Sequence, residues 1–150
     1  MATMIGSETN VRDTLKNLAS LEYDVAAAYR SAANRVDPTV GNATVLELIH
    51  VHEKRAQTLA PLIRGLGERP PRAGDWRQLK TQGRVVAGGL LGQNALFAAL
   101  VENERDVHEA YERAAKRHDV AGEIADLLYR FRDDTRRHHA QVTRRQLQLE

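Results

Sequence analysis

The segment 21–29, Leu-Glu-Tyr-Asp-Val-Ala-Ala-Ala-Tyr, decides how this sequence is interpreted, because its pattern returns later in the chain. Glu22 is followed seven residues later by Tyr29, and the same step separates Glu104 from Tyr111 at an offset of 82 residues. Seven residues are nearly two turns of an α-helix, about 10 Å, so both members of each pair share one face. The repeat indicates two related helices that each present an acid and a tyrosine on the same side.

Apolar residues recur at helical spacing around and beyond these two segments, which is typical of amphipathic helices. Pro38 and the glycines at 65 and 67 mark points where a helix ends. No stretch alternates between apolar and polar residues as a half-buried strand does, so the predicted class is all-α. The sequence predicts one domain over residues 1–150, with helices at about 10–36, 44–66, 94–117 and 120–147.

The longest connection, residues 67–93, differs from the rest of the chain in composition. Residues 65–92 hold seven of the ten glycines and the Pro70-Pro71 pair. The short connections after the first and third helices make each helix an antiparallel neighbour of the next. The long crossover between the second and third helices lets those two run parallel. The sequence therefore predicts a four-helix bundle made of two hairpins.

Each predicted helix carries an acidic residue on its apolar stripe. A charge on a buried face is costly unless it is paired, hydrogen-bonded or bound to a metal. Residues on antiparallel helices lie level when the midpoint of their numbers falls at the turn. The midpoint of Glu22 and Glu53 is 37.5 in the first hairpin, and that of Glu104 and Asp134 is 119 in the second. Both midpoints fall at predicted turns. We expect four carboxylates to converge at one depth: Glu22, Glu53, Glu104 and Asp134.

Composition narrows the classes of function. The 22 Lys+Arg and 20 Asp+Glu residues leave a formal charge of +2, which is ordinary for one soluble domain. The chain has no cysteine, so disulfides, thiolate zinc sites and cysteine nucleophiles are excluded. No signal peptide or membrane span is recognisable, and we expect a cytoplasmic protein. A nucleic-acid partner is not favoured, because acidic residues interrupt the arginine-rich stretch 130–145.

With the doubled glutamate–tyrosine pattern in place, the chain resembles the rubrerythrin/ferritin-like superfamily over residues 11–142. In that superfamily each helical hairpin has a glutamate with a tyrosine seven residues on, followed by a Glu-x-x-His motif. The chain is most similar to small bacterial ferritin-like four-helix-bundle domains. The resemblance implies a ferritin-like bundle with a long crossover, a carboxylate-rich site for iron or manganese, and a homo-oligomer, expected to be a dimer. It also implies ferroxidase or peroxide-related activity in a stress response.

The resemblance assigns roles to particular residues. Glu22 and Glu104 match the bridging carboxylates of the two hairpins, while Tyr29 and Tyr111 match the tyrosines that hydrogen-bond carboxylates across the site. The expected metal ligands are Glu22, Glu53, Glu104 and Asp134, with His138 as a fifth. The sequence departs from the family motif where Glu53 is followed by Ala56 in the histidine slot. In the fourth helix the glutamate slot is Asp134 or Thr135, and the histidine slot is Arg137 or His138.

A literal Glu-x-x-His does occur at Glu47-Leu48-Ile49-His50. Glu47 is accounted for by a predicted capping box with Thr44, and its position does not lie level with Glu22. His50 and His52 flank Glu53 and could approach a metal only if the helix were rotated.

Two interpretations of the carboxylates remain open at this point. Carboxylates with one imidazole suit iron or manganese, a pair of which can bind oxygen or peroxide. Alternatively, the acids belong to a polar network in a metal-free bundle that has no cofactor and acts as a structural or interaction protein. In that case the acids would be neutralised or hydrogen-bonded by Arg105, Arg137, His52 and the tyrosines. The apolar, glycine-rich region 85–101 is the candidate contact surface of that second interpretation.

Overall fold

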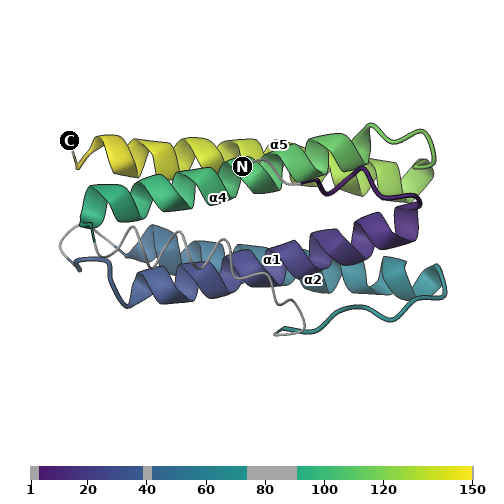
Figure 1. The fold of residues 1–150 in the computed structure, drawn as a ribbon, viewed down its shortest axis with the longest axis horizontal. Helices are drawn as coiled ribbons and strands as arrows, with labels where there is room; N and C mark the ends of the chain where they lie inside the picture. The colour runs from purple at the N-terminus through teal and green to yellow at the C-terminus, as the bar shows by residue number, and fades with distance from the viewer. Residues whose placement is uncertain (1–3, 39–41, 74–90, 150) are drawn as a thin grey trace.

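The computed structural model describes residues 4–38, 42–73 and 91–149, and within these ranges the chain forms four α-helices and no strand (Figure 1). The all-α prediction is confirmed, and the predicted helix ends agree with the structure to within three residues. Residues 74–90, which make up most of the expected crossover and part of the candidate contact surface, lie outside the described residues. The helices are α1 (Val11–Ala33), α2 (Ala43–Gly65), α4 (Gln93–Ala115) and α5 (Gly122–Leu147).

The helices are packed as two pairs. α1 lies mainly against α2, and α4 lies mainly against α5. The two pairs meet chiefly through α1 and α4, whereas α2 and α5 make few contacts. Figure 1 shows that α1 and α5 run in one direction and α2 and α4 in the other, so α2 and α4 are parallel. No helix among the described residues is long and apolar enough to cross a bilayer.

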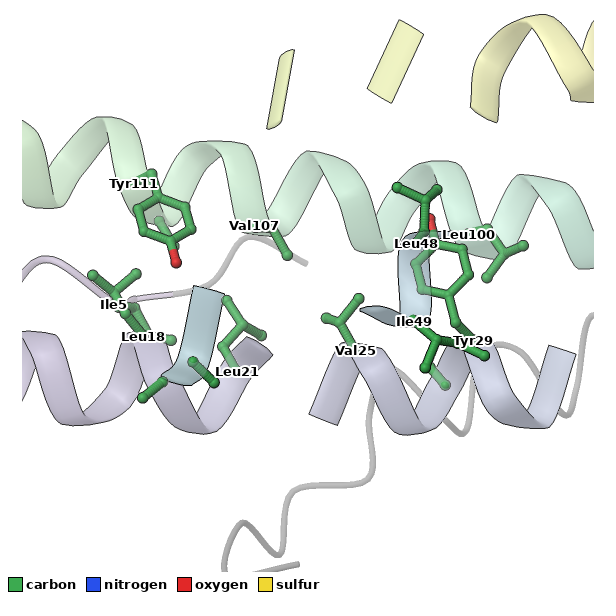
Figure 2. Close-up of a cluster of buried hydrophobic side chains, with 14 of the residues drawn as sticks. Ile5, Leu18, Leu21, Val25, Tyr29, Leu48, Ile49, Leu100, Val107 and Tyr111 are labelled. Atoms are coloured by element: carbon green, nitrogen blue, oxygen red, sulfur yellow. The ribbon is translucent and has the colours of Figure 1, made fainter. Parts of the chain in front are cut away.

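Apolar side chains between α1 and α4 form the centre of the core (Figure 2). Leu18 and Val25 of α1 and Leu100 and Val107 of α4 have no exposed surface. Burying a side chain of this size contributes about 1.5–3 kcal/mol. This contact between α1 and α4 therefore holds the two helix pairs together.

The helix starts differ in how they are capped. At the start of α1, the side chain of Asn10 accepts a hydrogen bond of 2.9 Å from the backbone N–H of Asp13. α2 begins at Ala43, after Asn42, and has no side-chain cap hydrogen bond. The predicted capping box is wrong, because Thr44 lies inside the helix, where its buried side chain cannot act as the cap.

Candidate functional site

Two glutamates, Glu22 from α1 and Glu104 from α4, lie in the middle of the core with no exposed surface. Both follow the helical stripe that also carries the buried leucines and valines, so the fold directs them inward. An ionised carboxylate buried in this way is stable only if it is paired with cations and hydrogen-bonded. The neighbours of these two carboxylates therefore decide what the site can do.

The two buried tyrosines donate hydrogen bonds across the contact between α1 and α4. The hydroxyl of Tyr29 donates to Oε1 of Glu104 at 2.7 Å, and the hydroxyl of Tyr111 donates to Oε1 of Glu22 at 2.6 Å. The expected tyrosine–carboxylate bonds across the site are thus present. Burial, followed by the charge of the adjacent glutamate, raises the pKa of both tyrosines well above 10, so each hydroxyl keeps its proton as the donor.

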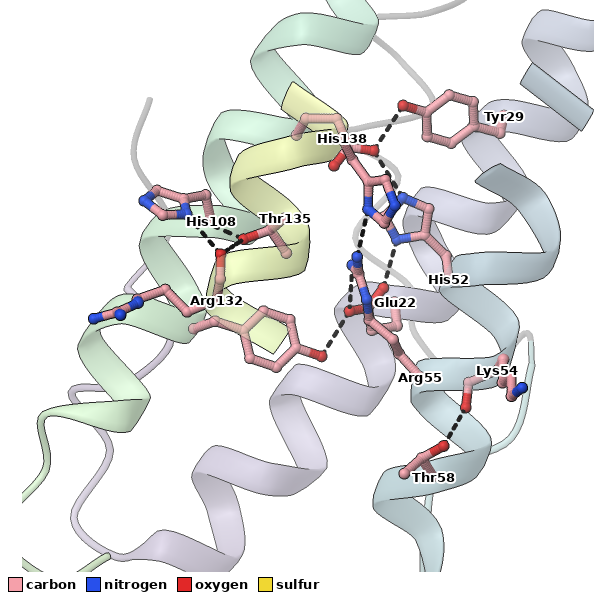
Figure 3. A network of polar contacts seen from close by, with 12 residues as sticks. Glu22, Tyr29, His52, Lys54, Arg55, Thr58, His108, Arg132, Thr135 and His138 are labelled. Carbon is pink, nitrogen blue, oxygen red and sulfur yellow. Dashed lines mark hydrogen bonds and ion pairs between the residues drawn. The ribbon is translucent and has the colours of Figure 1, made fainter. Parts of the chain in front are cut away.

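His52 of α2 lies between the two glutamates. Figure 3 shows its ring close to Glu22 and Arg55. Its Nδ1 is 2.5 Å from Oε2 of Glu22, and its Nε2 is 2.8 Å from Oε1 of Glu104. A carboxylate oxygen accepts hydrogen bonds, so both ring nitrogens must donate and the ring is an imidazolium. Burial lowers the pKa of His52, but the charges of Glu104 and Glu22 outweigh it and raise the pKa to about 9. His52 therefore acts as a charged bridge between α1 and α4.

Arg55 lies one turn after His52 and adds a second positive charge. Its guanidinium is 3.3 Å from Oε1 of Glu22, and Nη2 lies 2.6 Å from Nδ1 of His138 on α5. Arginine has no acceptor, so Nδ1 of His138 accepts this bond and a neutral ring carries its proton on Nε2. Burial and the Arg55 charge lower the pKa of His138. Arg55 thus connects the buried pair to α5.

The charges of this cluster cancel. Burial raises the pKa of Glu104, but the charge and hydrogen bond of His52 outweigh it and bring the pKa to about 2. Burial also raises the pKa of Glu22, but the charge of Arg55 and then the charge and hydrogen bond of His52 outweigh it. The pKa of Glu22 is therefore lowered as well. Two carboxylates face one imidazolium and one guanidinium, which gives a net charge of zero inside the core.

Two of the expected ligands lie elsewhere. Glu53 forms an ion pair with Arg30 of α1, and its side chain is 25% exposed. Asp134 forms an ion pair with Arg137 on its own helix, and its side chain is 35% exposed. The expected convergence of four carboxylates therefore does not hold for these two. These two side chains lie on a different face from the buried residues beside them, His52 and Thr135, because neighbouring residues on a helix point about 100° apart.

Of the cations expected to neutralise the carboxylates, His52 contacts Glu22 and Glu104 and Arg137 pairs with Asp134. Arg105 pairs with Glu102 instead.

Sequence reasoning missed Arg55, the second cation beside Glu22. The sequence does hold a signal, because His52-x-x-Arg55 has the same spacing as the Glu-x-x-His motif of the superfamily that the sequence resembles. The corresponding positions 83 residues later are Thr135-x-x-His138, and this segment faces inward from α5. Thr135 is buried and donates to the carbonyl of Arg132 at 2.6 Å. The literal motif Glu47–His50 has both of these side chains exposed, so neither contributes to the buried cluster.

The donor set does not fit a ferritin-like di-metal centre. Both nitrogens of His52 are engaged by carboxylate oxygens, and Arg55 is a cation that cannot ligate a metal. Nδ1 of His138 is engaged by Arg55. Within the part of the chain that the structure describes, no three His, Asp or Glu side chains are grouped so as to hold a metal ion. Of the four carboxylate oxygens, Oε2 of Glu104 has no hydrogen-bond partner there.

Comparisons with protein-family models, with curated proteins and with solved structures find no match for this chain. The functional argument therefore depends on the geometry of the buried cluster.

Proposed function

We propose that this protein is a metal-independent, ferritin-like four-helix bundle that acts as a structural or interaction protein. The observation that carries the proposal is the position of His52, whose imidazolium bridges Glu22 and Glu104 with Arg55 beside it. These two side chains supply the positive charge that a metal would supply in a ferritin-like centre. A divalent cation at the glutamates would have to displace both of them.

Helix directions and the repeated glutamate–tyrosine pattern support the ferritin-like part of the proposal. α2 and α4 run parallel, which a long crossover between them requires. The reciprocal bonds of Tyr29 to Glu104 and of Tyr111 to Glu22 relate α1 and α4 by an approximate twofold axis. Such an arrangement is what two similar hairpins produce when they pack face to face.

Burial supports a role that does not involve catalysis. Glu22, Glu104 and His52 have no exposed surface, and Arg55 is 4% exposed. A reaction needs an atom that a substrate can reach, and these charged groups offer none in the folded chain. Their contacts instead connect α1, α2, α4 and α5 to one another, so the cluster specifies how the helices pack.

Elemental analysis together with thermal unfolding tests this proposal. Protein purified without chelators is expected to contain far less than one iron or manganese ion per chain. Its melting temperature is expected to stay the same after addition of EDTA or of excess Mn²⁺. Multi-angle light scattering of the same preparation tests the expected homodimer.

One outcome would overturn the proposal in favour of an iron or manganese site. The protein would contain near-stoichiometric metal, and Glu104→Gln would lose it while the control variant Glu53→Gln, at a partly exposed position, would retain it. Because Glu104→Gln can also destabilise the fold, the melting response of the unmodified chain to Mn²⁺ provides a second readout. A clear rise in melting temperature with Mn²⁺ would contradict metal independence.

A further inference from the structure

A cavity of about 430 Å³ lies away from the buried cluster, on the outer side of the α1–α2 hairpin. One wall comes from the helices, with Tyr23 of α1 and Gln57 and Arg64 of α2. The other wall comes from the chain that follows α2, with Arg69, Pro70 and Arg72 among its residues. Figure 1 shows this chain turning back alongside the hairpin after α2 ends.

The turn after α2 is held in place by specific contacts. Gly67 has a φ of +81°, and the backbone N–H of Glu68 donates to the carbonyl of Ile63 at 3.1 Å, which closes the end of the helix. The carboxylate of Glu68 forms an ion pair of 3.3 Å with Lys16 of α1. Pro70 and the proline after it restrict the backbone that follows. The outer wall is therefore positioned against the hairpin by hydrogen bonds, an ion pair and backbone restriction.

The charge of the cavity is strongly one-sided. Three guanidinium groups line it, and none of the described lining residues is acidic. Arg64 and Arg69 form no hydrogen bond or ion pair with the described residues. Two guanidiniums that line one concave site, those of Arg64 and Arg69, therefore have no carboxylate partner among the described residues.

We propose that this cavity binds a phosphate-bearing small molecule. The planar fork of a guanidinium matches two oxygens of a phosphate group, and such bonds are stronger than neutral ones. The volume falls in the range of about 300–1,000 Å³ that is usual for small-ligand sites. The hydroxyl of Tyr23 and the amide of Gln57 provide neutral hydrogen-bonding groups for the rest of the ligand. This inference goes beyond the proposed function and does not depend on it.

Isothermal titration calorimetry of the full chain with pyrophosphate tests the proposal, at an ionic strength of about 0.15 M where surface charges are screened. The key variant is Arg64→Gln/Arg69→Gln, which changes two exposed side chains of the cavity. The matched control is Arg130→Gln/Arg136→Gln, which removes the same charge from exposed positions of α5. We expect the cavity variant to lose at least tenfold in affinity and the control to bind as the unmodified chain does.

Three results would overturn the assignment. The first is no binding of pyrophosphate by the unmodified chain. The second is an equal loss in both variants, which would make the effect one of net charge. The third is that a short single-stranded oligonucleotide binds more tightly than pyrophosphate and depends equally on both arginine pairs, which would indicate a nucleic-acid surface. Unfolding curves of both variants that match the unmodified chain exclude loss of structure as the cause.

Discussion

His52 should make the folded chain less stable as the pH rises from about 6.5 to about 9. Its pKa is 6.5 in an ordinary environment and about 9 between the two buried glutamates. Because the folded chain binds this proton more tightly, the stabilisation is complete below pH 6.5. It is lost progressively as the pH rises through the folded pKa.

The size of the effect follows from the two pKa values. Each pH unit between them corresponds to about 1.4 kcal/mol, so the proton on His52 contributes about 3 kcal/mol of stability. This is a large share of the about 5–15 kcal/mol by which a domain is usually stable. With a urea dependence of about 1–3 kcal/mol per molar, the unfolding midpoint should fall by about 1 M or more.

Urea unfolding followed by circular dichroism at pH 6.5 and pH 9.5 measures this change directly. His52→Gln should be less stable at pH 6.5 and should lose most of the pH dependence. His50→Gln is the matched control, because it changes an exposed histidine of the same helix and should retain the dependence. If the unmodified chain had the same midpoint at both pH values, or if His52→Gln kept the full dependence, the charged bridge would be refuted.

Two further predictions concern the same cluster. Glu22→Gln should lower the free energy of unfolding in urea by about 3–5 kcal/mol, because it leaves a buried cation without its partner. Glu53→Gln should lower it by less than about 1 kcal/mol, because the ion pair of Glu53 is partly exposed. Equal losses would contradict the placement of Glu22 on the buried face and Glu53 on the outer face. The triple variant His52→Glu/Arg55→His/Thr135→Glu should place Glu-x-x-His on both α2 and α5 and bind about two Mn²⁺ ions per chain, as di-metal bundles do. If calorimetry detects no Mn²⁺ uptake by the folded triple variant, these positions are not equivalent to the ligand positions of ferritin-like di-metal proteins.

The glutamate–tyrosine pairs could be predicted from the sequence because both members lie on a stripe of apolar residues. The offset of 82 residues and the seven-residue step placed Glu22, Glu104 and their tyrosines on inward faces, and the structure confirms this placement. The numbers also explain the crossed bonds. In an antiparallel pair, contacting residues have a constant sum, and 22 with 111 and 29 with 104 both give 133.

The cationic half of the cluster could not be predicted in the same way. The buried residues of α2 include 45, 48, 52, 55 and 59. The spacing of apolar residues predicts a stripe through 46, 49, 53, 56, 60 and 63, of which 49, 56 and 63 are also buried. Two polar residues, His52 and Arg55, lie on the true inner face. A stripe chosen to hold apolar residues and one acid therefore passes through Glu53 and Ala56, one position away from His52 and Arg55. The same shift separates Asp134 from the buried Thr135 on α5.

The two hairpins are unequal partners, because both cations of the cluster, His52 and Arg55, belong to α2. Every hydrogen bond that the structure gives to Glu104 comes from Tyr29 and His52, which both belong to the α1–α2 hairpin. Glu22, in contrast, has His52 and Arg55 within its own hairpin. The second half of the chain thus depends on the first half to neutralise its central acid. If the chain were cut in the crossover, the C-terminal half would carry an uncompensated charge on its apolar face until the N-terminal half docked.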